Sequence, residues 1–190
     1  RSTDSLLLFD NGAAKTSGET LSEGYGEIND QIATRFGMLF SAGEIDALSD
    51  GVAESVVDSS EIINTLGEGG ITTIGFASET IETDDSGGGL LDRFRGSNDG
   101  DDLQSAGDAT NRITSLVRRA TLGKLTLPCE RDSADRVLLI VAGPPEHLSR
   151  KGIDNAREWL ESETDCREVR AGDYPLPNEN RVAALVMLSG

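Results

Sequence analysis

The sequence predicts an α/β fold, a two-layer sandwich of the α+β type in which a long helix precedes a mostly four-stranded sheet packed with helices. Short continuous apolar runs alternate with segments whose apolar residues recur every three or four positions, as buried strands and amphipathic helices do. From residue 59 onward the order is helix, strand, helix, strand, helix, strand, strand, which favours one sheet covered by helices. A chain of 190 residues is long enough to bury such a core.

The first two elements are a strand and a long helix. Leu6 to Phe9 form an apolar run closed by an Asp-Asn-Gly turn, which predicts a buried parallel strand. An amphipathic helix follows, with one apolar stripe over five turns. The stripe consists of Leu21, Tyr25, Ile28, Ile32, Phe36 and Leu39. An acidic segment of small residues, 42–57, leads to the sandwich.

The remaining elements make up the sandwich. A short helix is predicted from Ser59 to about Leu66, ended by Gly67, and a strand from Ile71 to Ala77. Residues 79–104 are rich in Glu, Asp, Ser and Gly and predict a long mobile loop. The later elements are a helix to about Ala120, a strand over 136–142, a helix with Ser149 as N-cap, a short strand over 167–170 and a final strand over 181–189.

The charge balance narrows the function classes. The chain has 34 acidic and 17 basic residues, a formal net charge of -17, and only three lysines. Such a surface repels phosphate backbones and anionic lipid, so we expect no nucleic acid and no membrane as partners. The patterned apolar segments argue against disorder, and molar salt shortens the Debye length to about 3 Å. The composition therefore predicts a folded, halophilic protein.

The sequence shows neither an apolar run of about 20 residues nor a signal peptide, so we expect a cytoplasmic protein. The absence of an initial Met predicts a piece of a longer protein. Cys129 and Cys166 form no metal motif, and His147 is the single histidine, so no metal site is expected. Gly87-Gly88-Gly89 lacks the preceding strand and following lysine of a phosphate-binding loop.

One acidic pair stands at the start of the short helix. Asp58 and Glu61 have the spacing of a capping box, in which Asp58 accepts from first-turn amides and Glu61 reaches back. Two carboxylates on a loop at a helix start can also orient a water for attack on a phosphate. The two interpretations are compatible, because a cap fixes where the carboxylates point.

A second pair lies on the long helix. Tyr25 and Asn29 are four residues apart and therefore share a face. A tyrosine ring and an amide together can bind a purine base. The alternative is that Tyr25 belongs to the apolar stripe and Asn29 is solvated.

The order of these motifs resembles the second half of the tubulin/FtsZ superfamily. The chain is similar to haloarchaeal members, either FtsZ-related or CetZ-like. Asp58-Ser59-Ser60-Glu61 falls where FtsZ has Asp-Phe-Ala-Asp and α-tubulin has Asp-Leu-Thr-Glu. The other matching segments are Leu6–Ala13, Tyr25–Asp30, Gly69–Gly75, Val137–Pro144 and Arg181–Gly190.

The resemblance implies a polymerising GTPase that binds GTP or GDP with Mg²⁺ in the intact chain. It implies that Asn11, Tyr25 and Asn29 contact the guanine nucleotide. It implies that Asp58 and Glu61 enter the nucleotide pocket of the neighbouring subunit and position the attacking water. Residues 1–57 would hold the last strand of the GTPase half, the central helix and a connecting segment. Residues 58–190 would form the activation domain, with residues 79–104 where tubulin has its lateral-contact loop.

The family's phosphate-binding signature, a Gly-Gly-Gly-Thr-Gly-Thr-Gly loop, is absent from this sequence and would lie in the N-terminal half. We therefore expect this fragment alone to bind no nucleotide and to be inactive. Self-association into filaments is expected of the intact chain, in cell division or cell shape. Two alternatives stay open: a catalytically silent structural homologue, and a stand-alone α/β module that binds a ligand or regulates.

Overall fold

The computed structural model describes residues 5–10, 21–44, 57, 59–67, 69–81, 100–166 and 168–190. The helices are α2 (Leu21–Glu44), α3 (Ser59–Leu66), α4 (Gly100–Leu122) and α5 (Arg150–Thr164), with short 3-10 turns at Arg131–Ser133 and Pro145–His147. The strands are β1 (Leu6–Leu7), β2 (Ile71–Thr80), β3 (Arg136–Gly143), β4 (Val169–Pro175) and β5 (Arg181–Ser189).

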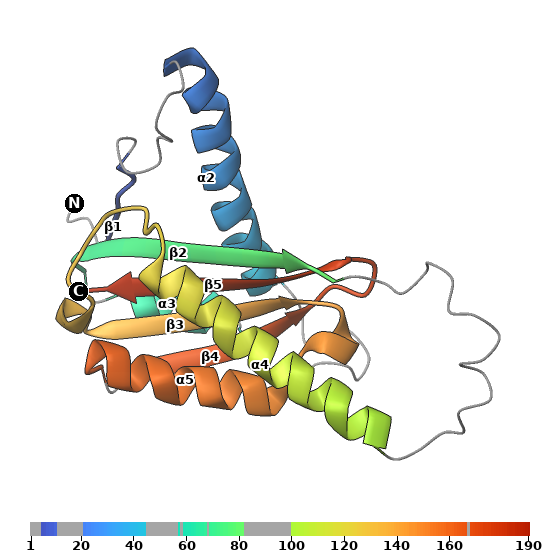
Figure 1. Cartoon of the computed structure of the whole chain (residues 1–190). Coiled ribbons are helices and arrows are strands. Elements are labelled where there is room, and N and C mark those ends of the chain that lie inside the picture. Colours follow the sequence, from blue (N-terminus) through green and yellow to red (C-terminus); the bar gives the residue numbers. More distant parts are fainter. Residues whose placement is uncertain are drawn as a thin grey trace.

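The strands form one mixed, five-stranded sheet in the order β1-β2-β5-β3-β4 (Figure 1). β5 lies in the middle and is antiparallel to both β2 and β3, whereas β3 and β4 are parallel. The sheet has one strand more than the four predicted in the sandwich, because β1 pairs with β2 in parallel. The predicted α/β fold class is confirmed.

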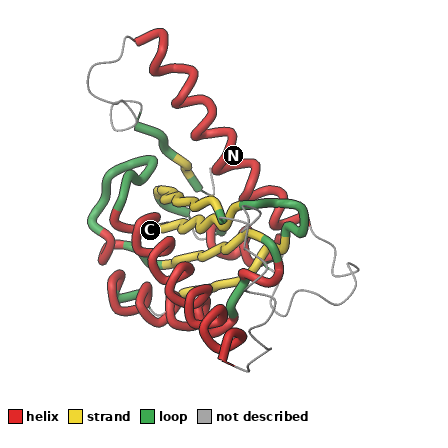
Figure 2. The backbone as a smooth tube through the Cα atoms, turned by 45° about the vertical axis from the view of Figure 1, so that its right-hand side comes forward, coloured by secondary structure: helices red, strands yellow, loops and turns green. Residues whose placement is uncertain are grey.

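Helices cover both faces of the sheet (Figure 2). Along β3, Val137, Leu139 and Val141 face a core shared with α4 and α5. Leu138 and Ile140 face the opposite way, into a second core shared with α2 and α3. This two-sided burial explains why β3 is a continuous apolar run rather than an alternating one. α2 and α3 thus add a third layer to the predicted sandwich.

Three predicted elements differ from the structure. The predicted boundaries of the loop over 79–104 are wrong at both ends. β2 extends to Thr80 because it pairs with β5, and α4 already begins at Gly100. β4 is longer than predicted because its pairing with β3 extends to Pro175.

β1 is parallel, as predicted, but the prediction that it is buried is wrong. Leu6 is 48% exposed, because β1 is an edge strand with β2 as its neighbour. The helix boundaries were predicted more accurately. α3 ends at Leu66 before Gly67. The Ser149 side chain accepts a hydrogen bond from the backbone N–H of Gly152 at 3.2 Å, which confirms the predicted N-cap of α5.

The N-terminal half of α2 projects beyond the sheet, whereas its C-terminal half lies across it (Figures 1 and 2). Leu39 and Ala42 are fully buried in the core with α3, and Ile28 is buried too. Tyr25 is 52% exposed. Of the predicted apolar stripe, Ile28 and Leu39 are therefore buried and Ile32 and Phe36 half-buried, whereas Tyr25 is exposed.

None of the helices that the structure describes combines the length and the apolar character needed to cross a membrane.

Candidate functional site at the two ends of the central helix

The first half of the candidate site lies on the projecting end of α2. Tyr25 and Asn29 are one helical turn apart on the same side and both are exposed. The alternative that Tyr25 belongs to the core is wrong, since half of its surface is accessible. A free aromatic face and an amide that both donates and accepts fit the flat surface and polar edge of a purine.

The second half of the candidate site lies on α3, which carries Glu61 in its first turn. Ile62 and Thr65 are buried against the sheet side, and the Thr65 hydroxyl donates to the carbonyl oxygen of Glu61 at 2.8 Å. Arg136 of β3 donates from Nη1 to the carbonyl oxygen of Asn64, near the end of the helix. These contacts hold α3 rigidly and place half-buried Glu61 at its start.

Two predicted site residues, Asn11 and Asp58, lie outside the described residues. Asp58 immediately precedes Ser59, the first residue of α3, so the sequence puts it at the cap position. The capping box and the role of Asn11 stay predictions. The division of the chain at residue 58 stays a prediction as well.

The structure keeps the two halves of the candidate site apart. α3 packs against the C-terminal end of α2, where Ile62 shares a core with Leu39 and Ala42. Thirteen residues separate Asn29 from Ala42, which corresponds to about 20 Å along a helix. Glu61 therefore does not reach a molecule bound at Tyr25 and Asn29 of the same chain.

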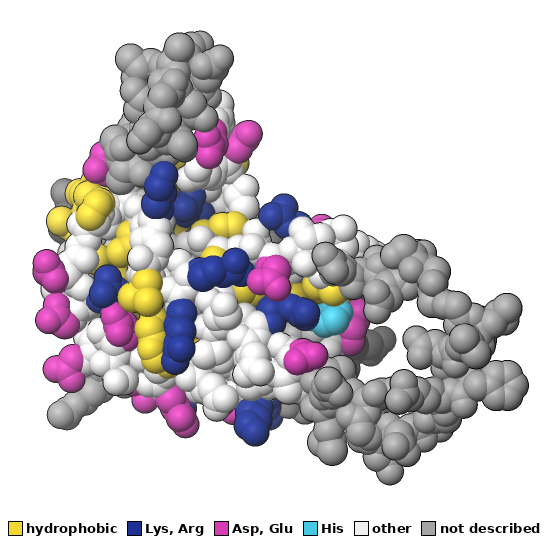
Figure 3. Space-filling view, viewed as in Figure 1, with side chains coloured by type: hydrophobic (Ala, Val, Ile, Leu, Met, Phe, Trp, Pro, Cys, Tyr) yellow, Lys and Arg dark blue, Asp and Glu magenta, His cyan; other side chains and the backbone are white. Residues whose placement is uncertain are grey.

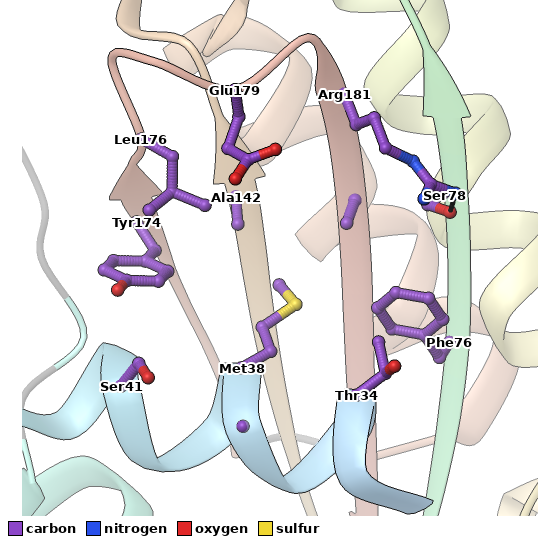
Figure 4. A pocket seen from close by; sticks show the side chains of 12 residues that line it. Thr34, Met38, Ser41, Phe76, Ser78, Ala142, Tyr174, Leu176, Glu179 and Arg181 are labelled. Atoms are coloured by element: carbon purple, nitrogen blue, oxygen red, sulfur yellow. Dashed lines mark hydrogen bonds between the residues drawn. The ribbon is translucent and has the colours of Figure 1, made fainter. Parts of the chain in front are cut away.

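Sequence reasoning missed a cavity of about 440 Å³ between α2 and the sheet (Figure 4). Met38 points into it from α2, and Phe76 and Tyr174 border it from β2 and β4. Thr34, Gly37, Met38 and Ser41 line its helical side. Each of these four residues lies three or four positions from another, so the sequence places them on one side of the helix. The sequence does not show that this side borders a cavity, because that depends on how α2 packs against the sheet.

Sequence reasoning also missed Arg35. The residue is 7% exposed, and its Cζ lies 5.9 Å from the ring centroid of Phe76. Burial lowers the pKa of the guanidinium from its ordinary value. The spacing held a signal, because Ile28, Ile32, Arg35 and Leu39 recur at steps of four, three and four. The predicted stripe placed Phe36 there instead.

The described residues contain no group of three or more His, Cys, Asp or Glu side chains placed to hold a metal ion. Cys129 is exposed and Cys166 is buried, and neither forms a disulfide. Burial raises the pKa of both thiols, so neither is activated as a nucleophile. The candidate chemistry thus depends on α2 and α3.

A long helix that lies across a mixed sheet is the arrangement expected of the C-terminal half of a tubulin-like protein. The family model described as "Tubulin-like CetZ, C-terminal domain" matches residues 18–190, and the chain belongs to this family.

Individual relatives support this assignment. The chain is 56% identical over 191 residues to the tubulin-like protein CetZ1 of Haloferax volcanii, covering 100% of this chain and 48% of the relative. The structure of CetZ1 from H. volcanii, a GDP-bound monomer, superposes with a TM-score of 0.76 at 47% identity. The structure of CetZ2 from H. volcanii, a GTPγS-bound protofilament, gives 0.75 at 40% identity. Each comparison covers 98% of this chain and 46% of the solved one, so the chain spans about half the length of these relatives.

Proposed function

We propose that this chain is the C-terminal part of a tubulin-like GTPase that polymerises head to tail, and that it activates hydrolysis in the neighbouring subunit. One observation carries the proposal: Tyr25 and Asn29 lie at one end of α2 and Glu61 lies beside the other. A bound nucleotide can then meet the acid only across a contact between subunits. A GTPγS-bound protofilament of CetZ2 supports such an assembly.

The proposed chemistry is the attack of water on the γ-phosphate of GTP. Glu61, together with Asp58, accepts hydrogen bonds from the water and aims its lone pair at phosphorus in line with the leaving oxygen. The new P–O bond forms as the bond to the β-phosphate oxygen breaks, and the water's proton passes to the carboxylate or to phosphate oxygen. The acids arrive with the next subunit, so hydrolysis requires assembly.

On the proposed nucleotide side, the Tyr25 ring stacks on the guanine and the Asn29 amide engages its polar edge, with Asn11 as a third contact. Mg²⁺ would neutralise the phosphates. We place these phosphates against the other half of the intact protein. The nucleotide of the CetZ1 monomer, GDP, supports guanine nucleotides as ligands.

Asn29→Ala is expected to weaken GDP binding to the intact protein roughly fivefold, because one polar contact to the base is worth about 1 kcal/mol. Isothermal titration of the nucleotide-free protein measures this change. Asp30→Ala is the matched control, since Asp30 is also exposed on α2 but points elsewhere. Equal affinity in the two variants would remove Asn29 from the site.

The function is tested by GTP-dependent sedimentation of the intact protein in molar KCl. We expect filaments with GTP and none without it, whereas failure to sediment under any nucleotide would contradict the proposal. The intact protein is then proposed to act as a cytoplasmic filament in cell division or cell shape, with neither nucleic acid nor membrane as partner.

The charge predicts that these filaments need high salt. On the face that carries α4 and α5, Asp and Glu side chains lie mainly along the left and lower margins, whereas Lys and Arg lie across the middle (Figure 3). The net charge of -17 makes subunits repel, and molar salt screens charges beyond about 3 Å. Sedimentation is expected to fall steeply when KCl is lowered from molar to about 0.1 M. Equal assembly at both concentrations would contradict the role of charge.

A further inference from the structure

Arg35 is a buried cation to which the described part of the chain offers no carboxylate. Its Nη1 donates to the Gln31 carbonyl oxygen at 3.2 Å and to Gln31 Oε1 at 3.4 Å. Among the residues that the structure describes, its Nε has no hydrogen-bond partner. The other contact is the Phe76 ring, which attracts a cation but does not neutralise it.

Other arginines of the described residues do form ion pairs with carboxylates. Arg112 and Arg119 both pair with Glu79, and Arg136 pairs with Glu168. These arginines are more exposed than Arg35, so they need a counter-ion less. A buried guanidinium whose Nε has no partner among the described residues points to an anion that comes from outside them.

The position of Arg35 indicates where that anion originates. Arg35 lies near the middle of α2, where the helix passes from the sheet to its projecting half. The chain covers 48% of the CetZ1 relative, so about as much polypeptide again lies outside the matching region. We infer that this polypeptide packs against the projecting half of α2, because an isolated helical segment of this length is marginally stable in water.

We propose that Arg35 forms a buried ion pair with a carboxylate of the other half of the intact protein, and that this pair fastens α2 between the two halves. A carboxylate that accepts from Nε and an adjacent Nη would complete the planar fork of the guanidinium. The inference rests on the proposed function in one respect: it assumes that the intact protein contains an N-terminal half in addition to this chain.

The test compares Arg35→Met in two forms, the 190-residue chain and the intact protein. In the chain alone, Met removes an uncompensated charge and keeps the apolar stem, so the Tm is expected to stay or to rise by roughly 2–4 °C. In the intact protein the same change leaves a carboxylate buried without its partner, so the Tm is expected to fall by at least as much. The proposal therefore predicts that Arg35→Met lowers the Tm of the intact protein but not that of the 190-residue chain.

Arg136→Met is the matched control. Arg136 pairs with Glu168 and donates to Asn64 inside this chain, so its loss is expected to lower the Tm in both forms. Arg35→Lys, which keeps the charge but not the fork, is expected to recover part of the Tm lost by Arg35→Met in the intact protein.

Two results would overturn the proposal. A lower Tm of Arg35→Met in the 190-residue chain would mean that contacts within this chain already stabilise the cation. A Tm that rises or stays unchanged in both forms would mean that the other half supplies no anion. Either result leaves GTP-dependent assembly untouched. If Arg35→Met lowers the Tm of the intact protein alone, but the intact protein never sediments with GTP, this inference stands and the proposed function fails.

Discussion

Glu61→Ala is expected to lower GTP turnover of the intact protein by about 10²- to 10³-fold while filaments still form. A positioned acid or base commonly contributes 10²–10⁴-fold to a rate, which sets this scale. Glu61 lies in the first turn of α3, and the buried residues that hold this helix are Ile62 and Thr65. Removing the carboxylate should therefore leave the apolar packing of α3 in place. Phosphate release and sedimentation, measured on the same samples, separate turnover from assembly.

Two further variants sharpen this prediction. Glu61→Gln keeps the shape and hydrogen-bonding oxygen but cannot take a proton, so it distinguishes orientation of the water from proton transfer. Glu158→Ala, an exposed acid on α5, is the control for loss of one negative charge. Unchanged turnover in Glu61→Ala would favour the catalytically silent homologue. Loss of filaments would make Glu61 an assembly residue instead.

Gly75→Ala is expected to lower the free energy of unfolding by about 3 kcal/mol, at the upper end of what overpacking costs. Gly75 lies on β2 directly beneath α4. An added Cβ would lie 2.0 Å from the carbonyl oxygen of Ala120 and 2.8 Å from its carbonyl carbon. These are backbone atoms of a packed helix, so the clash is relieved only if α4 moves away from the sheet.

Gly107→Ala is the control for this stability prediction, because Gly107 lies on α4 and an added Cβ there meets nothing within 4 Å. It is expected to raise the free energy of unfolding by up to about 1 kcal/mol, the helix propensity difference between Gly and Ala. Urea denaturation of both variants at one fixed molar salt concentration measures the contrast. A loss below about 0.5 kcal/mol in Gly75→Ala would show that α4 does not lie tightly on β2.

Much of this fold could be predicted because several elements carry strong local signals. β3 and β5 are continuous apolar runs, and both are buried on two faces. Ser149 is a favourable N-cap residue, which predicts the start of α5. The ends of β2 and α4 could not be predicted in the same way. β2 extends to Thr80 because it pairs with Arg181 of β5, a contact between residues far apart in sequence.

For the candidate site, too, local spacing could be predicted from the sequence and tertiary contacts could not. Helical spacing placed Tyr25 and Asn29 on one face of α2, and the structure confirms that arrangement. Spacing could not reveal that α3 packs against the far end of α2, because tertiary contacts of Ile62 decide this. Nor could it distinguish Arg35 from Phe36 as the residue that faces the sheet, since both fit a helical stripe within one position.

The central claim is that Glu61 of one subunit acts on the nucleotide of the next, and a mixing experiment tests it most directly. One intact variant carries Glu61→Ala and retains its nucleotide contacts. The other carries Tyr25→Ala with Asn29→Ala and retains Glu61. Each alone should hydrolyse GTP poorly. In mixed filaments the second variant offers its acid to the nucleotide of the first, so turnover should rise well above the sum of the separate rates. Turnover that stays at that sum, with both variants present in the same filaments, would contradict the account.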